Sequence, residues 1–201
     1  MKIKKVVVGP ISTNCYIVFD EKTKKGVIID PGGDADKIIK DAQGIDVVYI
    51  LNTHGHFDHI AANNKLQKYF QAKVVISEKD APMLVNAQKN YSLVINTELV
   101  KSSKADLLVH EGQSLEVGNL KFKVIAMPGH SPGSIGFLIK NHLFSGDVLF
   151  KSGFGITFSE KDHNTLMKSI KEKIFTLPDE TVVHPGHNLE TTVKEEKNNQ
   201  L

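Results

Sequence analysis

The sequence predicts an α/β (α+β) protein built as a four-layer αβ/βα sandwich, with two packed sheets inside and helices outside. Short runs rich in Val and Ile alternate with segments of helical periodicity, and strands followed by helices occur twice along the chain. The length of 201 residues suffices for one domain with a sizeable core. Because the chain contains no linker-like or low-complexity tract, residues 1–201 are expected to form a single domain.

The first half begins with short strands and one short helix. A helix over residues 35–43 closes at Gly44, because glycine favours helix ends. The turn sequence Asp30-Pro31-Gly32-Gly33 stops the strand that precedes this helix. Four runs rich in Val and Ile predict strands, at residues 3–8, 14–19, 26–29 and 46–51.

The segment after residue 51 combines helices with a weakly patterned connection. Apolar spacing predicts helices over residues 58–70 and 80–87, with a strand over 73–77 between them. Residues 88–106 show no clear period, which predicts either a lid over a substrate or a plain surface loop.

The second half predicts a meander of strands and then two helices. Gly112 and Gly118 mark two turns of the meander. Helices are expected over residues 162–175 and 189–197, with a strand over 181–184 between them. The meander strands are expected at residues 107–109, 114–117, 120–127, 134–140 and 142–145.

Composition points away from nucleic acids and membranes. The formal net charge is +2 and all 25 basic residues are lysine, so no arginine offers a bidentate clamp for phosphates. No apolar run approaches the roughly 18 residues of a membrane span, and the chain's start lacks the apolar length of a signal peptide. Cys15 is the single cysteine, which excludes an internal disulfide. We therefore expect a cytoplasmic protein with no nucleic-acid or membrane partner.

The segment Thr53-His54-Gly55-His56-Phe57-Asp58-His59 carries the strongest chemical signal. Histidine and aspartate are common ligands of zinc and related transition metals. Alternate residues of an extended segment point the same way, so His54 and His56 can converge on one ion. If a helix follows, Asp58 and His59 leave in another direction and suit a second ion. One short segment therefore predicts two adjacent metal sites.

Three later residues are candidates for the remaining ligands. His130, Asp147 and His187 each follow a predicted strand, and glycine or proline beside each one restricts the backbone. Taken singly, Asp147 could serve only to form a turn and His187 only to cap a helix. Together with the His-rich segment, the three residues favour a shared metal centre.

These motifs resemble those of a known family. The chain is similar to metallo-β-lactamase-fold hydrolases of the glyoxalase II (hydroxyacylglutathione hydrolase-like) group, in a short form. The matching segments run in the family's order and cover almost the whole chain: Thr-Asn-Cys-Tyr at 13–16, Ile-Asp-Pro-Gly at 29–32, Thr-His-Gly-His-Phe-Asp-His at 53–59, Pro-Gly-His-Ser-Pro-Gly at 128–133, Gly-Asp-Val-Leu-Phe at 146–150 and Pro-Gly-His at 185–187.

The resemblance implies the metallo-β-lactamase fold and two divalent metal ions. Zinc is the expected metal, with iron or manganese as alternatives. The true β-lactamases of this fold lack an aspartate at the position of Asp147, which favours the glyoxalase II-like group. The resemblance implies that one ion is held by His54, His56 and His130, the other by Asp58, His59 and His187, and that Asp147 bridges them.

The implied activity is hydrolysis of S-lactoylglutathione or a related small thioester or ester. Asp58 is expected to be catalytic, as a ligand that also orients the nucleophile. Asp30 is a candidate hydrogen-bond acceptor for a ligand histidine, or a cap of the turn that follows it. His184 adjoins the last ligand segment and is a candidate for lining the pocket, whereas His110 and His142 are expected at the surface.

The resemblance weakens where the family binds glutathione. Family members that hydrolyse glutathione thioesters carry a basic residue and a tyrosine where this chain has Ile156 and Phe158. Lys151 or Lys161 is a candidate for a substitute anion contact. The larger enzymes add a C-terminal helical domain, and because 14 residues follow His187, we do not expect one here.

Two other functions stay open at this point. A mononuclear iron persulfide dioxygenase shares the first motifs, and it would consume oxygen with a persulfide. A metal-binding scaffold without catalysis would hold the ions but turn over no thioester or ester.

Overall fold

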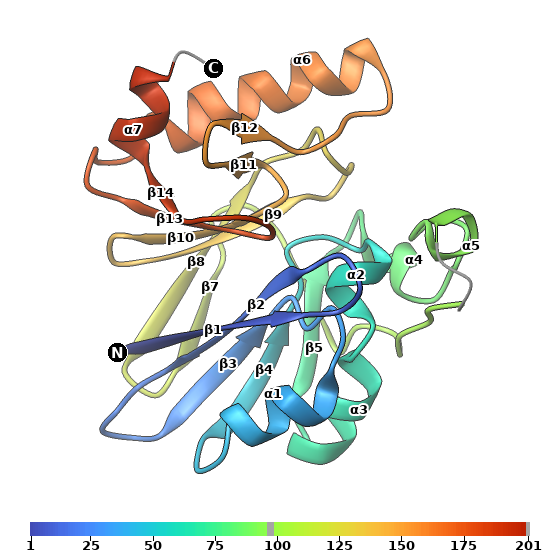
Figure 1. Cartoon of the computed structure of the whole chain (residues 1–201). Helices are drawn as coiled ribbons and strands as arrows, with labels where there is room; N and C mark the ends of the chain where they lie inside the picture. Colours follow the sequence, from blue (N-terminus) through green and yellow to red (C-terminus); the bar gives the residue numbers. More distant parts are fainter. Residues whose placement is uncertain (96–98, 200–201) are drawn as a thin grey trace.

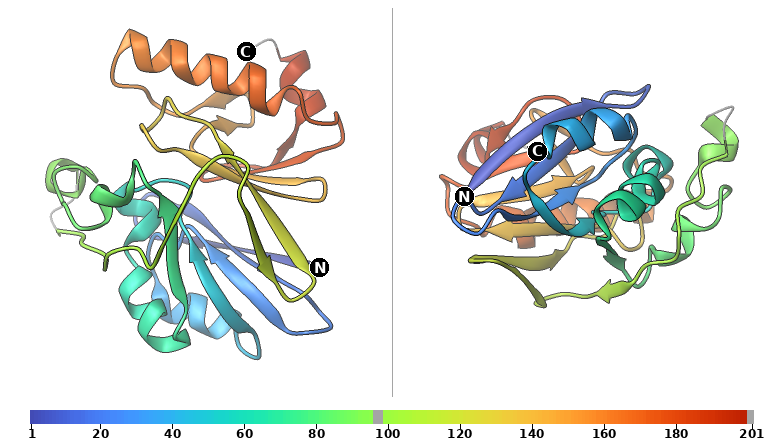
Figure 2. Two further views of the ribbon diagram at one scale, coloured as in Figure 1. Left: turned by 180° about the vertical axis from the view of Figure 1, so that it is seen from behind. Right: turned by 90° about the horizontal axis from the view of Figure 1, so that it is seen from below.

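Figure 1 shows the computed structural model, which describes residues 1–95 and 99–199. Two six-stranded sheets pack together, and helices lie on their outer faces, as the further views in Figure 2 also show. The strand order is β1-β2-β3-β4-β5-β6 in the first sheet and β14-β13-β10-β9-β8-β7 in the second. This arrangement is the predicted four-layer αβ/βα sandwich.

The elements of both sheets are short. The first sheet contains β1 (Lys2–Val8), β2 (Thr13–Phe19), β3 (Lys25–Ile29), β4 (Asp46–Leu51), β5 (Lys73–Ser77) and β6 (Leu107–Val109). The second contains β7 (Ser114–Val117), β8 (Leu120–Ala126), β9 (Ile135–Ile139), β10 (His142–Gly146), β13 (Val182–Pro185) and β14 (Thr191–Thr192). The remaining elements are the hairpin β11 (Leu149–Phe150) and β12 (Gly153–Phe154), the α-helices α1 (Ala35–Asp41), α2 (Phe57–Ile60), α3 (Asn63–Phe70), α4 (Ala81–Leu84), α5 (Ser92–Ile95), α6 (Glu160–Ser169) and α7 (Val193–Asn198), and the π-helix η1 (Ile170–Ile174).

Three apolar layers hold the sandwich together. The layer between the sheets includes Tyr16 of β2 and Phe122 of β8. Ile17, the next residue of β2, faces the other way and belongs to the layer under α1 and α3, because successive strand residues alternate in direction. On the second sheet, Leu166 of α6 and Ile170 of η1 complete the outer layer. Each sheet therefore buries both faces, which explains why its strands are rich in Val, Ile and Phe.

The topology gathers the polar loops at one edge of the sandwich. Strands β3, β4, β5 and β6 are parallel in the first sheet, and β10 and β13 are parallel in the second. Parallel strands end at the same edge of a sheet, where functional loops of layered α/β proteins lie. The loops after β3, β4 and β5 therefore face those after β10 and β13.

The predicted helix over residues 58–70 is two helices. Helix α2 ends at Ile60, and α3 begins at Asn63. The backbone N–H of Ala62 donates to the carbonyl of Pro31 at 2.9 Å instead of continuing the first helix. The break between the two helices therefore depends on a distant segment, because the acceptor lies in the loop after β3.

Other boundaries also differ from the predictions. The predicted helix over 80–87 shortens to α4, and the one over 162–175 becomes α6 followed by η1. A helix was predicted over 189–197, but residues Thr191–Thr192 form a strand that pairs with β13. Helix α7 begins after Thr192, which caps it by accepting from the Glu195 N–H. The β11–β12 hairpin and α5 were not predicted. The predicted strands are confirmed, each within one residue at either end.

The weakly patterned segment 88–106 contains α5, while its residues 96–98 lie outside the described residues. Cys15 is buried in β2, as expected. In the part of the chain that the structure describes, no helix has the length and apolar character needed to cross a membrane.

Candidate metal centre

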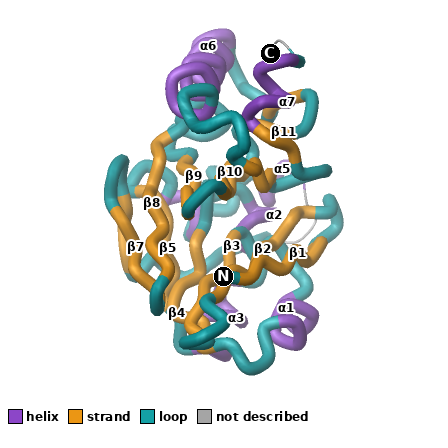
Figure 3. Tube along the Cα trace, turned by 90° about the vertical axis from the view of Figure 1, so that its left-hand side faces the viewer, coloured by secondary structure: helices purple, strands orange, loops and turns teal. Residues whose placement is uncertain are grey.

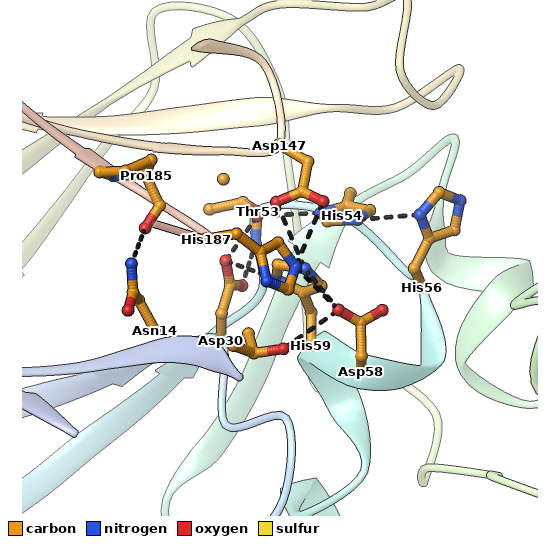
Figure 4. A network of polar contacts seen from close by, with 12 residues as sticks. Asn14, Asp30, Thr53, His54, His56, Asp58, His59, Asp147, Pro185 and His187 are labelled. Carbon is orange, nitrogen blue, oxygen red and sulfur yellow. Dashed lines mark hydrogen bonds and ion pairs between the residues drawn. The ribbon is translucent and has the colours of Figure 1, made fainter. Parts of the chain in front are cut away.

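The predicted ligands come together at this edge in three overlapping sets: His54 with His56 and His130, Asp58 with His59 and His187, and His54 with His59 and Asp147. We call the first two sets the first and second groups; Figure 4 labels all of these residues except His130. In the first group, His54 Nε2 lies 3.1 Å from His56 Nδ1, and His130 Nε2 lies 2.9 Å from the same atom. The His130 and His54 Nε2 atoms are 3.3 Å apart. His54 and His56 follow β4, whereas His130 follows β8, so the two sheets supply this group jointly.

The second group contains Asp58 and His59 of α2 and His187 of the loop after β13. Asp58 Oδ2 lies 3.1 Å from His59 Nε2 and 3.2 Å from His187 Nε2. The ligand atoms within each group lie within 4.8 Å of one another, a spacing that one ion can span. The alternating histidines and the first helical turn contribute to different groups, and His54 and His59 also meet in the set that contains Asp147.

Asp147 lies between the two groups. Its Oδ2 is 3.8 Å from His130 Nε2 of the first group and 3.5 Å from His187 Nε2 of the second. Its Oδ1 is 3.5 Å from His59 Nε2. One carboxylate thus reaches both groups, which is the position that a bridging ligand requires.

Unpaired buried atoms show that these residues fit metal ions. Among the described residues, His59 Nε2 and Asp147 Oδ1 are buried without a hydrogen-bond partner. Leaving such an atom unsatisfied costs about 1–3 kcal/mol, and a bound cation would satisfy both. Imidazole nitrogens and carboxylate oxygens are ligands for zinc and for iron. The clusters are therefore consistent with a dinuclear metal site.

The protonation states of the first group and of the two carboxylates suit metal binding. Burial lowers the pKa of His56 to about 3 and lowers that of His54 well below its usual value, so both rings stay neutral. Burial raises the pKa of Asp58 and Asp147, but the surrounding histidines, His59 foremost, together outweigh it and both carboxyl pKa values fall. Neutral imidazoles and ionised carboxylates are the forms that bind metals. At His59 and His187, the contacts with Asp58 and Asp147 together outweigh burial and raise the pKa, so metal binding there is coupled to proton release.

Backbone contacts fix the tautomer of His130. Its Nδ1 lies 2.8 Å from the carbonyl oxygen of Ile156. Because a carbonyl can only accept, Nδ1 carries the proton and Nε2 keeps its lone pair toward the first group. Ile156 therefore contributes through its main chain, although its side chain is 75% exposed.

Asp30 holds the His-rich segment through Thr53, a role different from the two that were predicted for it. Its Oδ1 accepts from the Thr53 N–H at 2.8 Å, and its Oδ2 accepts from the Thr53 hydroxyl at 2.7 Å. His59 Nδ1 lies 3.1 Å from Asp30 Oδ2, an ion-pair distance without hydrogen-bond geometry. Close packing also matters here, because a Cβ at Gly32 would collide with the carbonyl of Asp58.

Asp80 is a site residue that sequence reasoning missed. It is fully buried, its Oδ1 accepts from the Gly133 N–H at 2.7 Å, and its Oδ2 accepts from the Gly55 N–H at 3.2 Å and the Ser131 hydroxyl at 2.6 Å. One carboxylate therefore ties the loop of His54 and His56 to the loop of His130. Its position just after β5, at the same edge as the other loops, is the signal that could have identified it.

We expect Asp80→Asn to weaken metal binding by roughly 10- to 100-fold, the usual effect of removing a group that orients ligands. In the variant, an amide N–H₂ replaces one of the accepting oxygens of Asp80, so at least one N–H or hydroxyl donor loses its acceptor. Chelator competition measures the affinity, and circular dichroism checks the fold. Asp106→Asn is the matched control, because Asp106 also accepts from a backbone N–H, that of Val74, but away from the centre. Equal affinity in wild type and Asp80→Asn would refute this role.

His184 needs a correction. It was expected to line the pocket, but its ring stacks on Phe144 at 4.8 Å, and its Nδ1 lies 3.0 Å from Glu190 Oε1. His142, expected at the surface, is partly buried with Nδ1 2.9 Å from His184 Nε2. Stacking on Phe144 buries the His184 ring, and the His142 ring stacks in turn on His184. His110 is exposed, as predicted.

Two clefts reach the metal cluster, one beside each group. The first, of about 410 Å³, is lined by His56 and His130 of the first group and by Tyr91 and Phe158. The Tyr91 and Phe158 rings stack at 4.8 Å, and Tyr91 lies 5.0 Å from the His56 ring. Part of segment 88–106 thus lies at the site, as its interpretation as a lid would require. The second cleft, of about 670 Å³, is lined by His187 of the second group.

Comparison with known proteins gives one matching family model, that of the "Metallo-beta-lactamase superfamily", over residues 8–187. Three similar curated proteins carry different names. They are "Probable metallo-hydrolase YqgX" of Bacillus subtilis (36% identity, 98% of this chain and 95% of that protein), "Hydroxyacylglutathione hydrolase GloC" of Haemophilus influenzae (32%, 98% and 95%) and "Persulfide dioxygenase ETHE1, mitochondrial" of Homo sapiens (31%, 94% and 70%).

Two solved structures are similar over nearly the whole chain. "BLEG-1 B3 metallo-beta-lactamase" has a TM-score of 0.93 at 36% identity, covering 98% of this chain and 97% of that one. "TTHA1623 in a di-iron-bound form" has a TM-score of 0.85 at 32% identity, covering 96% of both chains. By their names, the first of these proteins is a metallo-β-lactamase and the second binds two iron ions.

Proposed function

Because the chain belongs to the metallo-beta-lactamase superfamily, we propose that it is a metal-dependent hydrolase that uses two divalent ions to cleave small thioesters. The observation that carries the proposal is the position of Asp147, with one carboxylate oxygen within 3.8 Å of ligand nitrogens from both groups. Zinc is the metal that we propose first, with iron or manganese as alternatives, since the ligand set suits all three. The proposed partner is a small-molecule thioester or ester.

When bound, the two ions supply an acidified water and polarise a carbonyl oxygen. The protein's part is to orient and to manage protons. Asp58 presents Oδ2 to His59 and His187 and accepts from the Thr13 hydroxyl at 3.1 Å, which fixes the carboxylate plane. Its Oδ1 can then accept a proton from the attacking water as the new C–O bond forms.

A thioester suits this machinery better than an amide. As the C–S bond breaks, the electron pair leaves on sulfur as a thiolate, whose parent thiol has a pKa of about 8.5. It needs no proton donor, so the lowered pKa values of Asp58 and Asp147, which leave both carboxylates without a proton to give, do not hinder its departure. The name of the GloC relative, a hydroxyacylglutathione hydrolase, supports the same bond type.

The persulfide dioxygenase relative supplies a second candidate function. The two are separated by products: a thioesterase releases an acid and a thiol without oxygen, whereas a dioxygenase consumes oxygen with a persulfide. We expect the metal-loaded protein to hydrolyse lactoylglutathione anaerobically and to consume little oxygen with glutathione persulfide. A β-lactam and an oxygen ester complete the panel. Oxygen uptake without thioester cleavage would overturn the proposal.

We expect weak selection for the glutathione tripeptide. Phe158, which lines the first cleft, and Ile156, whose carbonyl contacts His130 of that cleft, offer no partner for the carboxylates of glutathione at the positions where the family carries its basic residue and tyrosine. The lysines of the first cleft, Lys79 and Lys89, lie at other positions and are exposed, so they hold a carboxylate only weakly. Each lost charge-assisted contact is worth about 1.5–3 kcal/mol, or roughly one to two decades. The KM for lactoylglutathione should therefore be high, with little preference over a short thioester that lacks the tripeptide.

Ile156→Lys should lower the KM for the glutathione thioester selectively, because it places a cation beside the first cleft. Leu108→Lys is the control, since Leu108 is an exposed apolar residue of β6. Steady-state kinetics on the paired thioesters make the comparison. A low-micromolar KM for lactoylglutathione in the wild type, with strong preference over the short thioester, would contradict this prediction.

A further inference from the structure

The second cleft, on the His187 side of the metal cluster, has two lysines among its lining residues. Lys5 comes from β1 and Lys151 from the turn between β11 and β12, and both side chains are exposed. Figure 3 shows β1, β2 and β11 on one side of the molecule. His187, a residue of the second metal group, lines the same cleft. A substrate bound over the metals can therefore extend one arm toward both ammonium groups.

The acidic side chains around this cleft already have partners. Glu190 lies 3.0 Å from His184 Nδ1, and Glu196 accepts from the Ser152 N–H at 2.9 Å. Asp34 accepts from the Gly9 N–H at 2.9 Å. Among the described residues, Lys5 and Lys151 form no ion pair of 4.0 Å or less. Of the described residues, those that line the cleft include Lys5 and Lys151 and no carboxylate, so both ammonium groups are available to a ligand.

The walls of the cleft are fixed by their backbone. Ser12, Ser152 and Asn188 line it from three different loops, and each has a positive φ, of 61°, 59° and 66°. Non-glycine residues rarely adopt this conformation, and such residues cluster at ligand sites. The Asn14 amide donates to the carbonyls of Pro185 and Asn188, both at 3.0 Å, which fastens the loop of His187 to β2. The cleft is therefore formed before a ligand arrives.

Apolar side chains lie beside the two charges. Val7, Ile11 and Leu189 line the same cleft and are 44%, 46% and 63% exposed. They can pack on methylene groups that separate a scissile bond from a terminal charge. We propose that this cleft binds a substrate arm that ends in an acid group, carboxylate or phosphate, held by Lys5 and Lys151. The proposal rests on the proposed function in that the scissile thioester lies over the metals.

This specificity differs from recognition of glutathione. The cleft would select a terminal acid at the end of an apolar arm, whereas the arm of glutathione is a polar peptide. Binding of an acid-terminated arm in the second cleft is therefore compatible with the weak selection for glutathione that is predicted in the first cleft. The acid group could be carried by the acyl part or by the thiol part of the substrate, and the test examines these two possibilities separately.

The test measures binding and hydrolysis separately on the metal-loaded protein. Non-hydrolysable analogues, with a methylene in place of the thioester sulfur, carry a terminal carboxylate on the acyl side or on the thiol side. Each is paired with its neutral amide, and calorimetry gives both dissociation constants. We expect the carboxylate to bind about 10-fold more tightly than the amide on one side, since each exposed ionic contact contributes up to roughly five-fold. Added salt should reduce this preference.

The double variant Lys5→Ser with Lys151→Ser should bind the acid and the amide equally, while the amide's affinity stays at the wild-type value. Lys22→Ser with Lys104→Ser is the control, because both are exposed lysines that do not line the cleft. Thermal melting checks that both double variants are folded. An unchanged preference in the cleft variant, or no preference in the wild type, would overturn the proposal. Failure of thioester hydrolysis with a lysine-dependent preference intact would instead count against the proposed reaction alone.

Discussion

Asp58→Asn is expected to lower thioester turnover about 100-fold or more while the protein stays folded. The Asp58 carboxylate belongs to the second group and can both ligate an ion and accept a proton. Its Oδ2 is held by contacts with His59, His187 and Thr13. An amide keeps the size of the side chain but cannot take a proton from water. The loss should fall mainly on kcat, because Asp58 is not needed to bind the substrate's arms.

The measurement is steady-state kinetics on a variant whose metal content is known. Asp36→Asn is the control, because the Asp36 side chain is 83% exposed on α1 and pairs only with Lys65. Metal analysis of each protein separates a lost ion from a lost proton acceptor. Wild-type turnover in a folded Asp58→Asn protein would exclude the assigned role.

Asp147→Ala is expected to lower metal occupancy at both positions, which removing a ligand of only one group would not do. Its Oδ2 lies near His130 Nε2 of the first group and His187 Nε2 of the second. Without it, the imidazoles of both groups remain, but each group loses the anionic ligand that they share. Turnover should fall at least as far as in Asp58→Asn, because neither ion is then held in place.

Elemental analysis after dialysis at defined free metal gives the occupancy of each variant. The control is Asp179→Ala, whose carboxylate pairs with Lys197 on the surface. His187→Ala gives a second comparison, because its loss should lower one site more than the other. Two ions retained at wild-type affinity in Asp147→Ala would exclude a bridging position.

Much of the site could be predicted because its signals are local in the sequence. His54 and His56 alternate at the end of a buried strand, so their convergence follows from strand geometry alone. His130, Asp147 and His187 each follow a strand and have glycine or proline beside them. Which of these residues share an ion was implied by the family resemblance and not by the local patterns; the structure brings the residues of each implied set within 4.8 Å of one another.

Other features depend on contacts between distant segments, which no local pattern contains. The break between α2 and α3 requires the carbonyl of Pro31, 31 residues before the Ala62 N–H that it accepts from. Asp80 joins two histidine loops through hydrogen bonds to Gly55 and Gly133, yet a single aspartate after a strand resembles a helix cap. His184 was misplaced because its stacking on Phe144 depends on how β10 pairs with β13.

The two clefts also show what sequence could and could not establish. The absence of a cation at Ile156 was visible in the sequence, and the structure adds that this residue is exposed and that its carbonyl contacts His130 of the first cleft. Lys151 and Lys161 were equal candidates for an anion contact. The structure separates them, because Lys151 lines the cleft with His187, whereas Lys161 lies in a surface depression with Glu160 and Lys168.

The most direct test of the central claim is a metal titration of the depleted wild-type protein, with bound ions and thioester hydrolysis measured on the same samples. A dinuclear hydrolase predicts that activity rises to its plateau only as the content approaches two ions per chain. The same plateau should be reached without oxygen. Full activity at one tightly bound ion per chain, or bound metal with no hydrolysis of any thioester or ester, would contradict the account.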